Sequence, residues 1–224
     1  MFVVLASQWD EQAAALVRDW SGARLLTPDD LSLPGWVFCS SRPQKAIIVA
    51  GGEPLPVAEI SGVFTRLPQV MPHELIRIVP ADRAYVAAEM HAFLLAWLTS
   101  LQCPVVNCPS PQCLAGPAWG RERWVYEAAM LDIPVVEVAR ASAGSPSSLM
   151  PGEVVTVVGQ TILGTPNEQL RANAARLATG AKVTVLAASF QDGALLSASP
   201  WIDIADATIV EALASHFSVV ENGL

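Results

Sequence analysis

The chain has 224 residues, of which 52% are hydrophobic and 15% are charged, and its formal net charge is −8. A chain this apolar is not a disordered tail, because it can bury enough side chains to fold. The acidic balance, with only 13 lysines and arginines, argues against a surface that binds nucleic-acid phosphates.

Strand-like and helix-like segments alternate through the first part of the chain. Strands are expected at 2–7, 36–40, 45–52, 60–68 and 105–109, and helices at 9–20 and 81–101. Gly51-Gly52 predicts a turn, and Pro104 follows the end of the long helix. These elements predict a βαβ-type domain over residues 1–115.

A smaller α+β domain is expected over residues 116–224. Its expected elements are a helix at 120–132, a strand at 133–140, a strand pair at 153–164, a helix at 167–180, a hairpin at 182–201 and a helix at 204–217. Asp192-Gly193 is a strong hairpin signal, and Gly180 is expected to cap its helix. Residues 141–152, ASAGSPSSLMPG, have the composition of a linker.

The cysteines and the termini give no sign of export. Cys103, Cys108 and Cys113 are spaced C-x4-C-x4-C, wider than the C-x2-C pairs of zinc sites, so free thiols are favoured over a metal site. The N-terminus lacks a basic region, and the apolar run at 92–101 is about half of what a membrane span needs. We therefore expect a soluble cytoplasmic protein without a membrane partner.

Several local patterns, in this order, resemble the ATP-grasp superfamily. They are VFTRLP at 63–68, the helix with Tyr85 and Glu89, the VVNCP loop with Asn107 and Pro109, RERWVYEAAMLDIPVVEV from Arg121, EVVTVVGQTILG from Glu153, and the closing helix, hairpin and helix. The resemblance is to the peptide-ligase branch, which includes glutathione synthetase-like and graspetide-type ligases, and it covers about residues 60–220. It implies an N-terminal preATP-grasp-like α/β domain followed by an ATP-grasp-like α+β domain.

The metal ligands of that family are missing from the hairpin. The family carries an aspartate on the first hairpin strand and E-x-N-P on the second, which hold the Mg²⁺ ions that bridge the nucleotide phosphates. By the resemblance, E-x-N-P falls on Ser197-Ala198-Ser199-Pro200, and the aspartate falls near Ala188 or Ser189. Neutral hydroxyls bring no negative charge to hold a divalent cation. We therefore expect no metal ion, no cofactor and no catalytic residue.

The phosphate-gripping lysines and the lid also depart from the family pattern. The first lysine position falls on Arg121, and no lysine occurs between Lys45 and Lys182. From Ile133 to Asn167 there are roughly 30 residues, too few for another layered subdomain. The resemblance is therefore to a truncated and degenerate member, with a reduced α+β domain that lacks the lid subdomain.

The candidate ligand-binding residues are Arg66, Arg83, Glu89, Asn107, Arg121 and Arg123. The resemblance puts the first four at the inter-domain cleft, where they would contact a substrate or a partner peptide. In the structural alternative, Glu89 simply pairs with an arginine. The first turn at 121–123 could clamp an anion, or it could be a solvated helix end.

Other residues leave their alternatives open. Trp119, Trp124 and Trp201 either form an exposed binding patch or fill the emptied nucleotide pocket. Ser197 and Ser199 are weak candidates for nucleophiles, since no nucleophile-elbow pattern surrounds them.

These expectations combine into a non-catalytic ATP-grasp-like protein that holds a substrate peptide or a catalytic partner in a peptide-modification or peptide-ligation pathway. Two alternatives remain: a reduced ATP-dependent carboxylate–amine ligase that is active only with a partner chain, and a small-molecule binding protein that uses the old cleft. Loss of the lid would uncover apolar strands, so we expect a homodimer or a hetero-complex with residues from about 154 to 201 at the interface.

Overall fold

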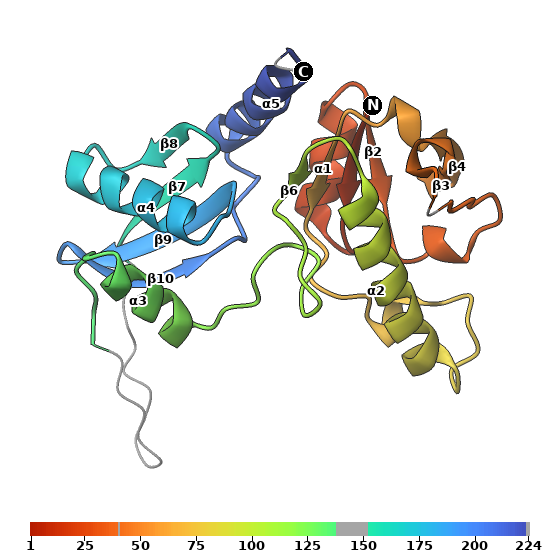
Figure 1. Ribbon diagram of the computed structural model, residues 1–224, viewed down its shortest axis with the longest axis horizontal. Coiled ribbons are helices and arrows are strands. Elements are labelled where there is room, and N and C mark those ends of the chain that lie inside the picture. The colour runs from red at the N-terminus through yellow and green to blue at the C-terminus, as the bar shows by residue number, and fades with distance from the viewer. Residues whose placement is uncertain (40, 138–151, 223–224) are drawn as a thin grey trace. The chain divides into compact units, whose positions relative to one another are not determined.

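The computed structural model describes residues 1–39, 41–137 and 152–222 (Figure 1). The chain divides into two compact units, the first formed by Met1–Ala118 with Phe217–Leu224 and the second by Trp119–His216. Of the linker expected at 141–152, residues 141–151 lie outside the described part of the chain.

Unit 1 is built on a four-stranded parallel sheet with the order β2-β1-β5-β6. The strands are β1 (Phe2–Leu5), β2 (Ala23–Leu26), β5 (Gly62–Thr65) and β6 (Val105–Val106), and the helices are α1 (Glu11–Asp19) and α2 (Arg83–Ser100). The chain runs from β1 through α1 to β2 on one side, and from β5 through α2 to β6 on the other. The strand order therefore reverses between β1 and β5, the kind of position where open α/β sheets bind ligands.

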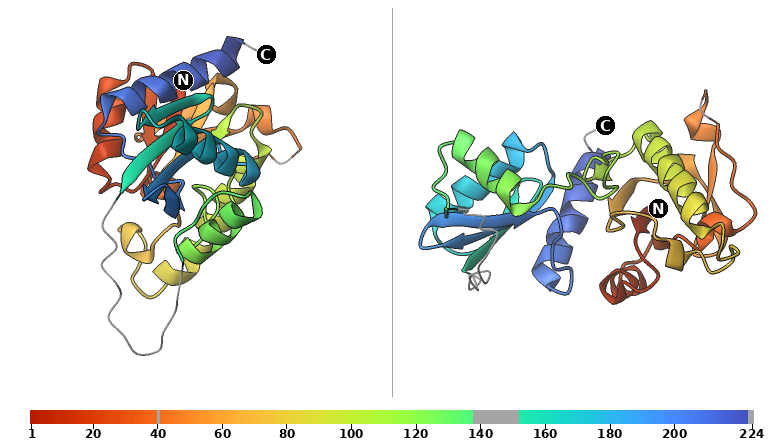
Figure 2. Two further views of the ribbon diagram at one scale, coloured as in Figure 1. Left: turned by 90° about the vertical axis from the view of Figure 1, so that its left-hand side faces the viewer. Right: turned by 90° about the horizontal axis from the view of Figure 1, so that it is seen from below.

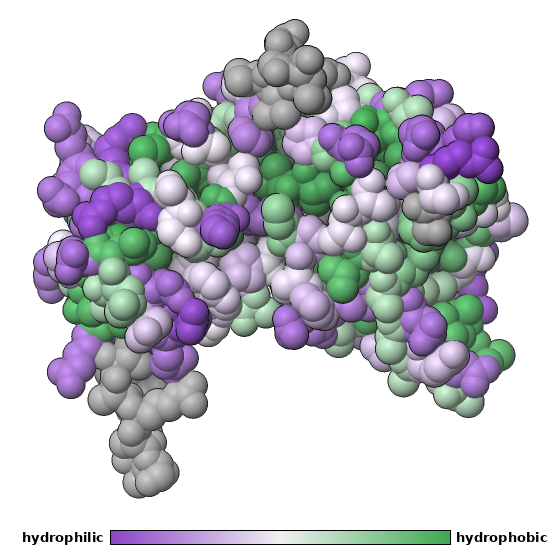
Figure 3. Space-filling model, viewed as in Figure 1, coloured by the Kyte–Doolittle hydropathy of each residue, from purple (hydrophilic) through white to green (hydrophobic). Residues whose placement is uncertain are grey.

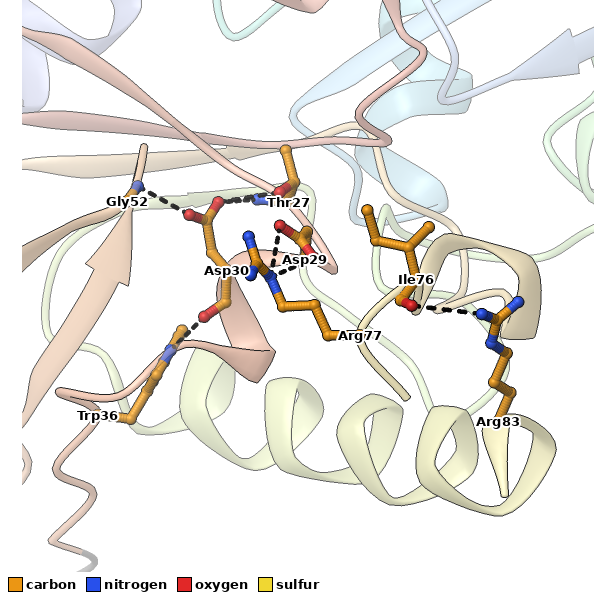
Figure 4. Close-up of polar contacts among 8 residues, drawn as sticks. All are labelled: Thr27, Asp29, Asp30, Trp36, Gly52, Ile76, Arg77 and Arg83. Carbon is orange, nitrogen blue, oxygen red and sulfur yellow. Dashed lines mark hydrogen bonds and ion pairs between the residues drawn. The ribbon is translucent and has the colours of Figure 1, made fainter. Parts of the chain in front are cut away.

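A hairpin and several short turns complete unit 1. Strands β3 (Ile47–Ala50) and β4 (Glu53–Pro56) pair across the predicted turn, where Gly51 and Gly52 both have positive φ angles, of 64° and 79°. The buried Asp30 holds this turn, because its carboxylate accepts hydrogen bonds from the amide of Gly52 and from Thr27 (Figure 4). The turn and the end of β2 are thereby fixed to the same side chain.

The long helix predicted at 81–101 is present as α2. Its residues Leu94, Trp97 and Leu98 are buried in a core shared with Val3 and Leu5 of β1. The sequence predicted this helix from its start at Pro80-Ala81-Asp82 and its end before Pro104.

The last helix, α5 (Ala207–Asn222), begins in unit 2 and ends in unit 1. Phe217 is 1% exposed, and its ring packs within unit 1 against Phe2 at 5.1 Å and Trp20 at 6.2 Å between centroids. A Cβ atom at Gly62 would lie 2.6 Å from the Phe217 ring, so only glycine lets the ring approach β5 this closely.

Unit 2 contains a four-stranded antiparallel sheet with the order β10-β9-β7-β8. Its strands are β7 (Glu153–Val158), β8 (Thr161–Gly164), β9 (Val185–Gln191) and β10 (Ala194–Ser199), and its helices are α3 (Arg121–Met130) and α4 (Glu168–Gly180). Both helices cover the same face of the sheet (Figure 2), where Trp124, Leu177 and Phe190 share one core.

The β9–β10 hairpin forms as predicted. Asp192 and Gly193 have φ angles of 50° and 84°, the pair of left-handed conformations that a tight two-residue hairpin turn uses. The β7–β8 pair is also confirmed, and its turn includes Gly159 with a φ angle of 57°.

Three local predictions are wrong. The strand expected at 36–40 is only an isolated bridge from Val37 to Ile47 in the described residues. Gly180 is not a left-handed cap: it is the last residue of α4, and the positive φ angle, of 54°, occurs at Lys182. Glycine is needed at 180 for space, because a Cβ atom there would lie 2.8 Å from a methyl group of Leu131. Instead of a full strand, the described part of 133–140 has an isolated bridge from Val135 to Leu195.

None of the helices in the described part of the chain has the length and apolar content to cross a lipid bilayer.

Candidate functional site

A buried ion pair lies at the carboxyl edge of the parallel sheet in unit 1. Arg66 directly follows β5, and Asp10 lies in the connection between β1 and α1. The Nε of Arg66 donates to Oδ2 of Asp10 at 2.8 Å, and its Nη2 donates to the side-chain oxygen of Gln12 at 3.2 Å. The two charged side chains are 3% and 10% exposed, so the pair is removed from water and each charge requires the other.

Asn107 lies at the same edge, directly after β6. It is 2% exposed, and it packs against Gly116, where an added Cβ atom would lie 3.0 Å from the Cβ of Asn107. The hydroxyl of Thr65, the last residue of β5, is buried and has no hydrogen-bond partner among the described residues. The carboxyl ends of β5 and β6 thus carry buried polar groups at an edge where α/β proteins often bind ligands.

Arg83 and Glu89 both lie on α2, but they do not join this cluster. Arg83 donates from Nε to the carbonyl of Ile78 at 2.8 Å and from Nη2 to the carbonyl of Ile76 at 3.3 Å, as Figure 4 shows in part. Arg83 therefore ties the segment before α2 to the helix. Glu89 is exposed and forms no ion pair with any described residue, so the expected pairing with an arginine is not found there.

The β9–β10 hairpin of unit 2 presents small side chains on the face away from α3 and α4. Ser197 pairs in register with Ser189 on this face, whereas Ala188 and Ala198 pack in the core under the helices, and the register shifts between Leu195 and Ser197. Ser189, Ser197 and Ser199 are half-buried, whereas the side chains that pack on the helices, such as Phe190, are buried. The positions that the resemblance assigns to metal ligands therefore do lie beside one another, and they carry hydroxyl and methyl groups.

Arg121 joins α3 to this hairpin. It is the first residue of α3, and its Nε donates to the carbonyl of Leu196 at 2.8 Å. Its Nη2 is buried and has no hydrogen-bond partner among the described residues. The Nε of Arg121 thus holds β10, while its buried Nη2 is a donor without a partner among the described residues.

Arg123 belongs to a different environment on the same helix. Its guanidinium carbon lies 5.4 Å from the ring centroid of Trp119 and 5.3 Å from that of Tyr126, and it forms an ion pair with Glu127. The exposed arginine is stabilised by two cation–π contacts rather than aimed at the hairpin.

The three tryptophans of this region have different roles. Trp124 is fully buried in the core of unit 2, with the half-buried Trp119 at 4.7 Å between ring centroids. Trp201 follows β10 and is 46% exposed. Trp124 is therefore a core residue and Trp201 a surface residue, and the choice between a binding patch and a filled nucleotide pocket stays a prediction.

Binding of a metal ion requires several donor side chains close together. No group of three or more His, Cys, Asp or Glu side chains in the described ranges could hold a metal ion. The four cysteines are free thiols, and burial raises the pKa values of Cys103 and Cys113. The hydroxyl and methyl groups at the hairpin do not fit Mg²⁺, which prefers carboxylate oxygens.

Sequence reasoning missed the partners of Arg66. Asp10 carried one local signal, an aspartate directly before an amphipathic helix, which predicts a helix cap. Its second role depends on the pairing of β1 with β5, two strands that are far apart in sequence. Nothing in the local pattern of Gln12 or Thr65 indicated that they lie at the edge of the sheet.

No family model and no curated protein sequence matches this chain. Comparison with solved structures, in contrast, gives one consistent fold, that of the ATP-grasp ligases, over almost the whole chain. The ATP-grasp-like α/β fold expected from the sequence resemblance is therefore confirmed, while the reduced second domain and the missing lid stay predictions.

The similar structures are peptide-modifying enzymes. The macrocyclase MdnC from Microcystis aeruginosa MRC, bound with precursor peptide MdnA, matches with a TM-score of 0.65 and 12% identity, over 98% of this chain and 99% of that chain. The ATP-grasp ligase PsnB, complexed with minimal precursor, Mg and ADP, gives 0.62 and 10%, over 97% and 98%. The macrocyclase MdnB from the same Microcystis strain gives 0.58 and 11%, over 98% of both chains.

Proposed function

We propose that this chain is a non-catalytic ATP-grasp-like protein that holds a substrate peptide or a catalytic partner in a peptide-modification or peptide-ligation pathway of the cytoplasm. In this proposal it is a truncated and degenerate relative of the ligases, with a reduced α+β domain that lacks the lid subdomain. The observation that carries the proposal is the hairpin, where the positions that the resemblance assigns to metal ligands, Ser197, Ser199 and Ala188 or Ser189, carry no carboxylate.

The chemistry of those side chains supports the loss of catalysis. Transfer of a phosphoryl group from ATP needs divalent cations to neutralise the phosphate oxygens, and these cations need negatively charged oxygen ligands. Two serines facing each other across the hairpin provide neutral oxygens only. The proposal therefore contains no step that passes through a nucleotide or a metal ion.

The binding role is supported by the fold and by the polar cluster of unit 1. Structures of MdnC and PsnB with this fold were determined with precursor peptides bound. In unit 1 the charge of Arg66 is already compensated by Asp10, so the polar cluster at this edge is nearly neutral and pre-formed. Thr65 adds a buried hydroxyl and Asn107 a buried amide at the same edge.

One observation favours the runner-up, a reduced ligase that works only with a partner chain. The buried Nη2 of Arg121 has no partner among the described residues, and a phosphate oxygen would satisfy it. A partner would then have to supply the carboxylates for the metal ion. A small-molecule binding protein that uses the old cleft remains the third candidate.

Calorimetry separates these possibilities. We expect the isolated protein to show no binding of ATP in the presence of Mg²⁺, and Arg121→Ala to behave in the same way. Micromolar affinity for Mg²⁺–ATP that is lost in Arg121→Ala would overturn the non-catalytic proposal in favour of the reduced ligase. Micromolar affinity for Mg²⁺–ATP that is unchanged in both Arg121→Ala and Arg121→Gln would point to a nucleotide site elsewhere on the chain.

A further inference from the structure

A groove of about 400 Å³ lies on unit 1 between α2 and the segment that follows β5. One wall consists of Val70, Met71 and Pro72, and the other of Ala84, Ala87 and Ala88 on the helix. The three alanines are spaced i, i+3 and i+4, so they lie on one face of α2, and their short side chains leave the space open.

The groove is uncharged where an occupant would sit. Its lining contains no Asp, Glu, Lys or Arg side chain. A charged group placed there would lose its hydration without gaining a partner, which is costly. The complementary occupant is therefore an apolar side chain.

Exposed apolar side chains also occur along the segment that starts in one groove wall and leads into α2. The segment from Met71 to Tyr85 carries four exposed large hydrophobic residues, which are Met71, Ile76, Val79 and Tyr85, at 43%, 57%, 60% and 70%. Figure 3 shows hydrophobic residues in green over the part of unit 1 where this segment lies. Exposed hydrophobic residues gathered beside a groove mark a surface that binds a partner.

The side chains of His91 and Gln69 each bring a hydrogen-bond acceptor to the groove. Nε2 of His91 lies 3.1 Å from the carbonyl of Pro111, which can only accept, so this nitrogen carries the proton and a neutral ring leaves Nδ1 as an acceptor. Gln69 donates from Nε2 to the carbonyl of Gln112 at 3.1 Å, which leaves its side-chain oxygen for another donor.

The main chain of the groove wall is also available. Gln69, which is exposed, forms no hydrogen bond with another main-chain group in the described ranges. An extended peptide supplies N–H donors and C=O acceptors at regular spacing, together with apolar side chains. A lipid chain would leave these polar groups without partners.

We propose that this groove binds an extended, uncharged peptide segment, with an apolar side chain of the peptide seated between Met71 and the alanines of α2. The inference rests on the proposed function, which it deepens by assigning the peptide contact to a surface of unit 1. Hydrogen bonds from peptide N–H groups to Gln69 and His91 would fix the direction of the segment.

The test uses the full chain and a displayed library of random linear peptides, followed by fluorescence anisotropy with the enriched peptides. Ala88→Leu and Ala84→Leu fill the groove from exposed helical positions, where leucine is a good helix former. Ala96→Leu, at another exposed position of α2 outside the groove lining, is the matched control. Thermal unfolding of all three variants checks that the fold is kept.

We expect the selection to enrich peptides with an apolar residue, and we expect Ala88→Leu to raise their Kd by about tenfold or more while Ala96→Leu leaves it unchanged. Enriched peptides that bind the groove-filled variants as well as the native chain would overturn the location and leave the peptide-holding function standing. A selection that enriches no peptide at all would overturn both.

Discussion

Asp10 holds helix α1 with one carboxylate oxygen and Arg66 with the other. Its Oδ1 accepts the amide of Ala13 at 3.0 Å, and its Oδ2 accepts Nε of Arg66 at 2.8 Å. One side chain thus fixes the start of the helix that follows β1 to the residue that follows β5. The two halves of the reversed strand order are linked at this point.

Removing one partner of this pair should destabilise the protein strongly. Arg66→Met leaves the carboxylate of Asp10 buried without a cation, and we expect a loss of about 3–5 kcal/mol in the free energy of unfolding, measured in urea. Adding Asp10→Asn removes the unpaired charge and keeps a good helix cap, so the double variant should recover part of the loss.

The control for this prediction is the pair between Arg77 and Asp29, whose side chains are 53% and 20% exposed (Figure 4). Arg77→Met should cost no more than about 1 kcal/mol, because a solvent-screened pair contributes little. Equal losses in Arg66→Met and Arg77→Met would contradict the burial argument.

The isolated protein should neither hydrolyse ATP nor join a carboxylate to an amine. The reason is the lack of anionic ligands beside the hairpin, and the measurement is phosphate release and product mass with Mg²⁺ present. A steady turnover in the native chain that disappears in Arg121→Ala would refute this expectation, since contamination by another ATPase would not respond to that substitution.

Restoring the two hairpin residues should not create activity. Ser197→Glu with Ser199→Asn brings back one anionic ligand and one amide, but position 121 is still an arginine, and under the proposed function the lid is absent as well. We expect no ligation product from this double variant under conditions where a complete ATP-grasp ligase is active. Detectable product would mean that the missing lid and lysines are not needed.

Acidification should destabilise the protein partly through His216. Burial lowers the pKa of this histidine from its ordinary value of 6.5, so the folded state favours the neutral ring. The unfolded chain then takes up the proton first as the pH falls. The stabilisation is present above the unfolded pKa and is lost as the pH falls from there through the lower folded pKa.

The measurement is urea unfolding at about pH 7.5 and about pH 5. The free energy of unfolding of the native chain should fall by more than that of His216→Gln, which cannot take up a proton. The same pH dependence in both proteins would assign the effect to other groups.

Association of the chain remains a prediction. The structure leaves fewer apolar side chains exposed in the expected interface than the sequence suggested. The long apolar side chains of β7 and β9, such as Val155 and Phe190, are buried under the helices of unit 2, so the strands are less exposed than the sequence suggested. Exposed large hydrophobic residues between 154 and 201 are Val154 and Trp201 in the described ranges. We still expect a homodimer or a stable hetero-complex that buries on the order of 1,000 Å².

Light scattering at micromolar concentration tests this expectation. Val154→Asp with Trp201→Asp should dissociate a homodimer, whereas Tyr85→Asp on unit 1 should not. A native chain that is strictly monomeric and recovers no partner on purification from its source would argue against association through this region.

The elements could be predicted from the sequence wherever the signal is local. The turns at Gly51-Gly52 and Asp192-Gly193, the long helix α2 and the strand pair at 153–164 all follow from residue type and short-range spacing. The candidate residues were less predictable. For Arg121 the sequence left open an anion clamp and a solvated helix end, but its contact with the carbonyl of Leu196 depends on the packing of segments 75 residues apart.

The same limit explains the error at Gly180. A glycine at the end of a helix usually supplies a left-handed conformation, and the sequence contains no information about Leu131 lying against it. Long-range packing decides which property of glycine is used at a given site, its missing side chain or its free backbone.

The placement of Phe217 has a consequence for the order in which the chain folds as it is made. Domains of a growing chain usually fold from the N-terminus onward. Here the ring that completes the aromatic cluster of Phe2 and Trp20 belongs to α5, which follows all of unit 2 in the sequence. The N-terminal unit therefore cannot complete this cluster until unit 2 and α5 have been made, and until then Gly62 leaves a gap on β5 where the ring will pack.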